Sequence, residues 1–306
     1  MNEPNHTTVS EIFLLGFKNI HKFKILIFIL LLVVYCVTIC GNLLIITLVS
    51  YSRTLHSPMY FFISQLSMFD ILLSTDIVPN TLASIIAEGL VMSFSGCITQ
   101  FYIFGCSESL ECFILAAMAY DRYLAICNPL RYTTIMNFSL FLKMILISWM
   151  LGAALILVTT LSIFGLEFCG PNVIDHFFCD FAPIIQLSCS ETSTVEMEVF
   201  YMSVFVMILP FFMTVTSYGC IVNTILNLSS NLQRSKAFST CSSHLIIVCI
   251  FYGTLISIYI IPTKGVSLTI NKVASLLYTV ITPMLNPIIY SLRNKDIKDL
   301  IRKLQN

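Results

Sequence analysis

In the stretch MAYDRYLAICNPLRY, from Met118 to Tyr132, an acid, a base and a tyrosine follow the apolar run ILAAMA. A helix that carries Asp121, Arg122 and Tyr123 at the end of a membrane-length segment can hold the arginine against its neighbouring aspartate at the cytoplasmic boundary, until a partner draws it away. An ordinary helix end also collects charges. The triplet therefore indicates a switch only in combination with the apolar segments of the rest of the chain.

Composition places the chain in a membrane. It is 57% hydrophobic and 10% charged, whereas about a quarter of the residues of a soluble domain are charged. Its formal net charge is zero, which gives no basis for binding a nucleic acid.

Windows of about 20 apolar residues match a hydrocarbon layer of roughly 30 Å. They predict an all-α membrane protein with one seven-helix domain over residues 1–306, an outer tail at 1–24 and a cytoplasmic tail at 293–306 that forms a short amphipathic helix. Asp70, Asp76 and Pro79 lie in the second window and leave its outer boundary open. The helices are expected near 25–49, 58–80, 98–120, 140–161, 197–226, 239–262 and 272–292.

Loop charges predict the orientation. With the N-terminus outside, most lysines and arginines fall on the inner side, as the positive-inside rule requires, although Lys22 and Lys24 locally favour the reverse. The polar start MNEPNHTTVS lacks the order of a cleaved signal, so the first helix is expected to act as the insertion signal. Asn5 begins a glycosylation sequon in this outer tail.

Four cysteines, Cys97, Cys169, Cys179 and Cys189, fall at or beyond the outer membrane edge. An even number in oxidising surroundings predicts two disulfides, with three pairings open. The run from His176 to Asp180 is also compatible with a metal site, but a disulfide would remove Cys179 as a thiolate ligand.

Five motifs follow one another along the chain: LHSPMYFF (Leu55–Phe62), MAYDRYLAICNPLRY, SYG (Ser217–Gly219), KAFSTCSSHL (Lys236–Leu245) and PMLNPIIYSLRN (Pro283–Asn294). In this order and spacing they resemble the vertebrate odorant receptors, tetrapod-type class, a branch of the rhodopsin-like G-protein-coupled receptors. Together with the short N-terminal tail and the cysteine-rich second outer loop, the motifs extend the resemblance over essentially the whole chain. One departure from the wider rhodopsin-like pattern is shared with odorant receptors: Phe251-Tyr252-Gly253 replaces a tryptophan and proline pivot.

The resemblance implies roles for individual residues. Activation is expected to free Arg122 from Asp121, so that the opened inner face accepts a G-protein helix. The implied disulfides are Cys97–Cys179 and Cys169–Cys189. The inner switch comprises Asp121, Arg122, Tyr123, Tyr218 and His244, together with the last-helix hinge Asn286, Pro287 and Tyr290, where proline interrupts the helical hydrogen bonds.

Two acids lie at similar depths inside the membrane, Asp70 on the second helix and Glu111 on the third. With Asn42 and Asn286 they can surround a hydrated cation, and in the resembled family these positions are a sodium site of the inactive state. The alternative is a neutral hydrogen-bond cluster in which one carboxyl stays protonated. No other cofactor is expected.

Helical spacing places several residues of the third helix on one stripe, and the resemblance implies that this stripe faces a ligand cavity. The resemblance supplies the opposite walls, and packing between helices is the ordinary alternative for each position. An apolar cavity suits a small, volatile, mostly hydrophobic ligand. The expected contacts are Phe101, Phe104, Gly105, Glu108, Ser109, Cys112, Met202, Ser203, Val206, Met207, Phe251, Tyr252, Leu255, Tyr259 and Thr279.

Glu108 lies nearly one helical turn before Glu111 on that stripe. A carboxylate there is costly unless it meets a cation, a donor or water. It either pairs with an amine odorant or donates as a protonated acid to a carbonyl or hydroxyl odorant. The alternative is that it assists Glu111 and Asp70 in the ion cluster or bonds to a nearby tyrosine.

The resemblance implies an odorant receptor, not an enzyme, in the plasma membrane of olfactory sensory cilia. Its partners would be a small odorant, a stimulatory heterotrimeric G protein of the olfactory type that raises cyclic AMP, and membrane lipid. The alternatives are a rhodopsin-like receptor for a non-olfactory metabolite and a transporter, which would show an inverted repeat or a charged pathway through both leaflets.

Overall fold

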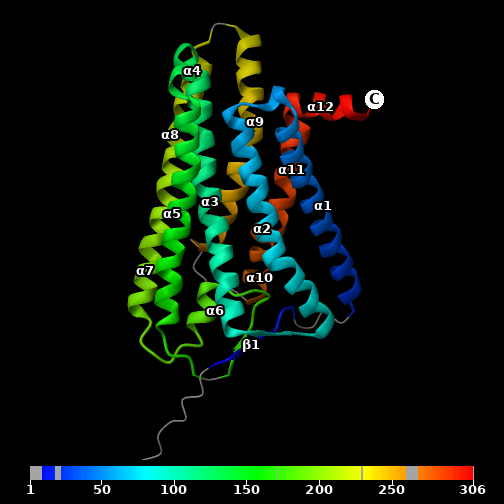
Figure 1. Ribbon diagram of the computed structural model, residues 1–306, viewed down its shortest axis with the longest axis vertical. Coiled ribbons are helices and arrows are strands. Elements are labelled where there is room, and N and C mark those ends of the chain that lie inside the picture. The colour runs from blue at the N-terminus through cyan, green and yellow to red at the C-terminus, as the bar shows by residue number, and fades with distance from the viewer. Residues whose placement is uncertain (1–8, 18–21, 170, 229, 260–267, 306) are drawn as a thin grey trace, which may run out of the picture.

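The computed structural model describes residues 9–17, 22–169, 171–228, 230–259 and 268–305. Long helices run side by side between two ends of a bundle (Figure 1). They are α1 (Lys24–Tyr51), α2 (Pro58–Ala87), α3 (Phe94–Cys127), α5 (Phe138–Phe164), α7 (Ser193–Ser203) with α8 (Leu209–Leu226), α9 (Asn231–Tyr259), and α10 (Leu268–Leu276) with α11 (Thr282–Arg293). Shorter helices are α4 (Tyr132–Ile135), α6 (Phe181–Ile185) and α12 (Lys295–Gln305).

Six helical segments among the described residues are long and apolar enough to cross a membrane, and α9 adds a shorter apolar stretch, Cys241–Leu255. This is the predicted seven-transmembrane bundle. The window expected at 239–262 runs into residues 260–267, which lie outside the described part of the chain.

Each of the first five spans extends beyond its predicted apolar window, and polar residues cap the start of two of them. Ser93 accepts a hydrogen bond from the Gly96 N–H and starts α3, and Asn137 accepts one from the Leu140 N–H and starts α5. The second window ended at residue 80, too early. The helix passes through Pro79 and ends at Ala87, followed by Glu88 in the left-handed region at φ 61°.

Proline shapes two of the spans. A π-helical turn, Val204–Ile208, joins α7 to α8 before Pro210, and another, Leu277–Ile281, joins α10 to α11 before Pro283. Proline has no N–H and crowds the carbonyl four residues earlier, so the ladder widens there. The first turn brings Val206 into a buried position.

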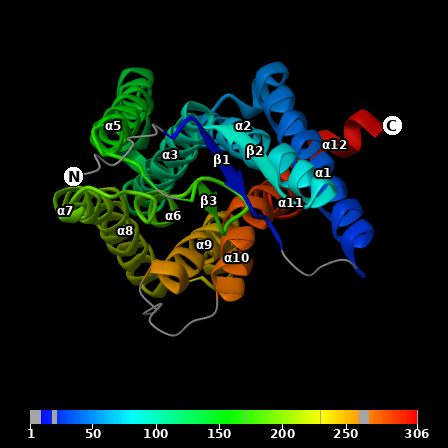
Figure 2. The ribbon, with the colours of Figure 1, turned by 90° about the horizontal axis from the view of Figure 1, so that it is seen from below.

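The outer end carries a small sheet in the order β2-β1-β3. Strand β1 (Glu11–Leu14) pairs antiparallel with β2 (Leu90–Ser93) and parallel with β3 (Val173–Ile174). Figure 2 shows these strands lying across the outer end of the bundle. The segment predicted as a plain outer tail therefore contains a strand whose Ile12 and Leu14 are fully buried.

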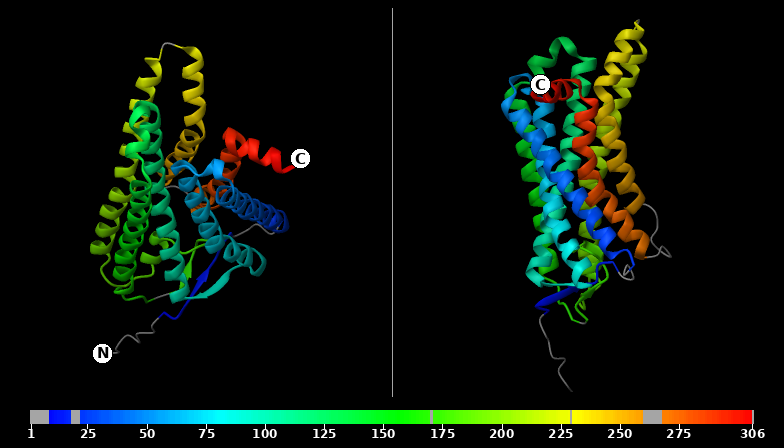
Figure 3. Two further views of the ribbon diagram at one scale, coloured as in Figure 1. Left: turned by 45° about the horizontal axis from the view of Figure 1, so that its top comes forward. Right: turned by 90° about the vertical axis from the view of Figure 1, so that its right-hand side faces the viewer.

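The inner end carries α12, which runs across the spanning helices (Figure 3). Asn294 is extended, and its Oδ1 accepts hydrogen bonds from the backbone N–H groups of Asp296 and Ile297. The Tyr60 hydroxyl on α2 donates to Asp296 Oδ2 at 2.6 Å. These bonds hold the start of α12 against the bundle.

Many large apolar side chains face outward along the spanning helices. On α1 they include Ile25 at 74% and Leu30 at 59% exposure, and on α5 Met150 at 72%. Such a belt of side chains suits the hydrocarbon interior of a bilayer. A helix also satisfies its own backbone hydrogen bonds there. The same helices bury a large apolar core that includes Phe62, Leu115 and Leu255.

Candidate functional site

The inner end of α3 holds a closed ion pair. Asp121 is fully buried, and its Oδ2 accepts from Arg122 Nη2 at 2.5 Å and Nε at 3.1 Å. The Tyr132 hydroxyl donates to Asp121 Oδ1 at 2.8 Å. Burial and the neighbouring Asp121 raise the pKa of Tyr132, so this phenol remains a donor near neutral pH. Arg122 is thus held by a carboxylate that is itself anchored.

A second pair joins α8 to α9. The Tyr218 hydroxyl and His244 Nδ1 lie 2.7 Å apart, and His244 is fully buried. Within the described part of the chain, His244 Nε2 has no hydrogen-bond partner. Tyr123 packs beside this cluster from α3. The predicted switch residues Tyr123, Tyr218 and His244 therefore pack together, while Arg122 remains bonded to Asp121.

The hinge residues of α11 contact α1, α2 and α3. Asn286 Nδ2 lies 3.1 Å from each carboxyl oxygen of Asp70. Pro287 packs against Gly41, where an added Cβ would lie 3.1 Å from the proline ring. Tyr290 is 1% exposed, and its hydroxyl lies 4.0 Å from Met118 Sδ. The hinge residues are therefore packed against three other helices.

A buried polar cluster surrounds Asp70. Asp70 and Glu111 are close enough for their charges to repel each other. Asn42 donates to the Thr38 and Pro283 carbonyls. Among the described residues, Asn42 Oδ1, Ser74 Oγ and Glu111 Oε1 are buried without a hydrogen-bond partner. Each of these three oxygens can therefore accept a further contact, and Ser74 also retains its hydroxyl hydrogen.

A cavity of about 150 Å³ opens between α3, α5, α6 and α7 towards the outer end. Residues predicted as ligand contacts make up much of its wall. They are Phe101, Phe104, Gly105, Glu108, Ser109, Met202, Ser203, Val206 and Met207.

Other predicted contacts lie in the packed interior instead of lining this cavity. Cys112 and Leu255 are fully buried, and Phe251 and Tyr252 are 3% and 4% exposed in the same apolar core, because α9 closes against α3 and α8 there. Thr279 is also fully buried and donates to the Ser275 carbonyl on its own helix. The side chain of Tyr259 and residue Asn5 lie outside the described residues.

The cavity wall also contains residues that the sequence argument missed. One of them, Ile156 of α5, lies against Gly105 of α3. A Cβ at Gly105 would lie 3.0 Å from Ile156 Cγ2, so the glycine allows the two helices to approach. Asp180 directly follows the disulfide cysteine Cys179, and that adjacency was the available signal. The missed lining residues are Ile156, Thr159, Asp180, Phe181, Ala182 and Val199.

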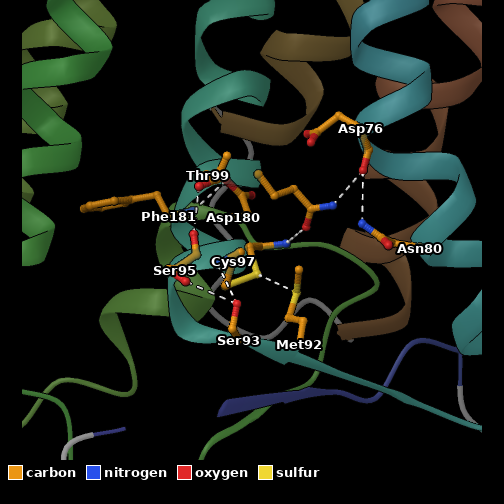
Figure 4. Close-up of a disulfide and its surroundings, with 12 residues drawn as sticks. Asp76, Asn80, Met92, Ser93, Ser95, Cys97, Thr99, Asp180 and Phe181 are labelled. Atoms are coloured by element: carbon orange, nitrogen blue, oxygen red, sulfur yellow. Dashed lines mark hydrogen bonds between the residues drawn. A yellow bond between two sulfur atoms is a disulfide. The ribbon is translucent and has the colours of Figure 1, made fainter. Parts of the chain in front are cut away.

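A disulfide ties the outer loop to α3 beside the cavity (Figure 4). Cys97 and Cys179 are bonded with their Cα atoms 5.4 Å apart. Gln100 strengthens the link, because it accepts from the Cys179 N–H and donates to the Asp76 carbonyl, each at 2.9 Å. This connection positions Asp180 and Phe181 over the outer part of α3.

The second disulfide joins Cys169 to Cys189. Both pairings are those that the resemblance implies. With Cys179 in a disulfide, the run from His176 to Asp180 lacks the thiolate of the metal alternative. No group of three or more metal-ligating side chains of the kinds His, Cys, Asp and Glu occurs within the described ranges.

A buried cation joins the last spanning helix to the outer loops. Lys272 Nζ donates to the Gly16 carbonyl at 2.7 Å and to Asp175 Oδ1 at 2.6 Å. The adjacent His176 is 7% exposed and stacks on Phe177. Burial, then the Lys272 charge, lowers the pKa of His176 from 6.5 to about 4. The imidazole is therefore neutral at pH 7.

Comparison with known proteins agrees with this geometry. The sequence model of the olfactory receptor family matches residues 31–306. Olfactory receptor 11L1 of Homo sapiens is 46% identical over 304 residues, covering 99% of this chain and 94% of the relative. Olfactory receptor 10A7 of Homo sapiens is 46% identical over 299 residues (98% and 95%), and olfactory receptor 5P73 of Mus musculus is 44% identical over 303 (99% and 92%). This chain therefore belongs to the olfactory receptor family.

Proposed function

We propose that this chain binds a small, volatile, mostly hydrophobic odorant in the cavity between α3, α5, α6 and α7, and activates a stimulatory G protein of the olfactory type. Its family consists of G-protein-coupled receptors, not enzymes, and the chain is a multi-pass protein of the plasma membrane. The observation that carries the proposal is the mainly apolar cavity at the outer end of the same helix that ends in the closed Asp121–Arg122 pair.

Helix α3 connects the two sites. Phe101 and Glu108 line the cavity, and Arg122 lies further along the same unbroken helix. A ligand that favours a different packing of α3 against α7 and α5 shifts the population towards states in which Arg122 leaves Asp121. The freed arginine and the inner ends of α8 and α9 then form the surface for a G-protein helix, while membrane lipid covers the outward apolar belt.

The polar cluster around Asp70 supports a second part of the proposal, a sodium ion that favours the inactive state. The unpartnered oxygens of Asn42, Ser74 and Glu111 are the hard donors that such a cation prefers. Replacing sodium with N-methylglucamine is expected to raise basal signalling, and Asp70→Asn is expected to remove that response. Equal basal signalling in both salts would instead favour a neutral hydrogen-bond cluster.

The main experiment expresses the chain with an olfactory-type stimulatory G protein and measures cyclic AMP against a panel of chemically diverse volatiles. At least one volatile is expected to raise cyclic AMP in a dose-dependent manner. The matched control is an Arg122→Ala variant with equal surface staining, which is expected to stay silent. A surface-expressed receptor that answers none of the volatiles, but answers a non-volatile metabolite, would contradict the odorant assignment.

A further inference from the structure

The cavity wall contains two acids and no base among the described residues that line it. Glu108 comes from α3, and Asp180 immediately precedes α6. Their charges are close enough to repel each other. Most of the remaining wall is aromatic or aliphatic, so neither acid receives a protein cation there.

One of the two carboxyl groups has a buried oxygen without a hydrogen-bond partner. Glu108 Oε1 is fully buried and accepts no hydrogen bond from the described part of the protein. Asp180 Oδ1 accepts from the Phe181 N–H at 2.7 Å. Burial raises the pKa of Asp180, and the hydrogen bond from Phe181 lowers it. A buried carboxylate without a donor is unfavourable, so a cationic ligand would supply the partner that Glu108 Oε1 lacks and would also pair with the neighbouring Asp180.

Among the described lining residues, two of the three hydroxyl groups direct their hydrogens to the backbone, and that of Ser203 remains as a donor for a ligand. Ser109 donates its hydroxyl hydrogen to the Gly105 carbonyl at 2.7 Å, and Thr159 donates to the Leu155 carbonyl at 3.5 Å. The polar part of the cavity therefore presents mainly acceptors. A ligand rich in donors fits this wall better than a carbonyl compound, which needs a donor from the protein.

We infer that the cavity selects a small protonated amine whose ammonium group lies between Glu108 and Asp180. The inference rests on the proposed function and gives its ligand a chemical class. The rings of Phe101, Phe104 and Phe181 line the same space and are suited to contact both an ammonium group and an apolar body. The volume of about 150 Å³ matches a ligand of about the size of benzene.

The test compares matched ligands on matched receptors. Cyclohexylamine, protonated at pH 7, and cyclohexanol have nearly the same size, and they stand in a panel of small primary amines with their alcohol counterparts. Cyclic AMP dose-response curves are recorded for the wild type, Glu108→Gln and Asp180→Asn at equal surface staining. Glu196→Gln is the matched control, because Glu196 is an exposed acid on α7 outside the cavity.

Amines are expected to act on the wild type at concentrations at least about tenfold below those of their alcohols, since a hydrogen bond to a charged group contributes about that factor or more. Glu108→Gln is expected to remove this preference, with the potency of the alcohols unchanged, and Asp180→Asn to reduce it. Glu196→Gln is expected to leave both potencies unchanged. If Glu108→Gln does not reach the surface, Glu108→Asp, which keeps the charge, and Asp180→Asn carry the test.

The possible outcomes separate this inference from the proposed function. Neutral volatiles that activate the receptor while every small amine is inactive, or an equal loss of potency for amines and alcohols in Glu108→Gln, would overturn the amine assignment alone. A change in sodium sensitivity without a change in amine potency would place Glu108 with the Asp70 cluster and likewise overturn it. Silence towards every volatile would instead defeat the proposed function.

Discussion

Acidification is expected to destabilise the outer end through His176. The imidazole is buried against Phe177 and Phe178, and Lys272 and Asp175 are its charged neighbours. Because burial and the Lys272 charge lower the pKa of His176 to about 4, the folded protein keeps this ring neutral at pH values where the unfolded chain protonates it.

The sign and size follow from the two pKa values. Above pH 6.5 the ring is neutral in both states, and the contribution of His176 to stability is complete. As the pH falls towards 4, the unfolded state gains a proton that the folded state does not, so stability decreases by about 1.4 kcal/mol per pH unit. The loss is roughly 2 kcal/mol at pH 5 and about 3 kcal/mol once the pH reaches 4.

The assay is thermal unfolding of the detergent-solubilised receptor at several pH values between about 7.5 and 4.5. The only tryptophan, Trp149, packs against Phe69 and serves as the fluorescent reporter. His176→Gln is expected to flatten the dependence of Tm on pH, whereas His56→Gln, at an exposed histidine, keeps the wild-type slope. Identical slopes for the wild type and His176→Gln would refute the reasoning.

Further outcomes are expected at the switch, the disulfide and the cavity wall. Arg122→Ala abolishes ligand-dependent cyclic AMP, and Asp121→Asn raises basal cyclic AMP at matched surface levels because the buried anchor of the arginine is lost; unchanged signalling in Arg122→Ala would remove this residue from the mechanism. Cys97→Ser costs about 2–5 kcal/mol and lowers surface delivery measured by antibody staining, unless peptide mapping finds Cys97 unpaired in the wild type. Gly105→Val brings a side chain within 3.0 Å of Ile156 and weakens the response to bulky odorants more than to small ones; equal weakening would argue against a wall at Gly105.

The seven spans and the family resemblance could be inferred from the sequence because both depend on local information. A run of about 20 apolar residues is readable without any tertiary contact, and so are the motifs around Asp121 and Pro287. The ends of the helices could be predicted less well from the sequence. Helix α2 continues through Pro79, and in the turn before this proline Gln100 of α3 donates to the Asp76 carbonyl at 2.9 Å, a contact between helices that local sequence does not reveal.

Part of the candidate site followed from helical spacing taken together with the family resemblance. Phe101, Gly105 and Glu108 lie on one stripe of α3, and the cavity lies along that stripe. Phe251 and Leu255 on α9 are buried in the apolar core, and a residue that packs between helices faces inward just as a wall residue does. Periodicity identifies the inward face of a helix but not the gap between two helices.

What the sequence determined by itself was the class of the protein, its spanning segments and the presence of Glu108 on an inward stripe. Only the tertiary structure decided which groups meet. The loop residue Asp180 joins Glu108 in one cavity because the Cys97–Cys179 bond and Gln100 hold that loop against α3. Contacts between residues so far apart in the chain depend on packing and loop closure, which local patterns do not encode.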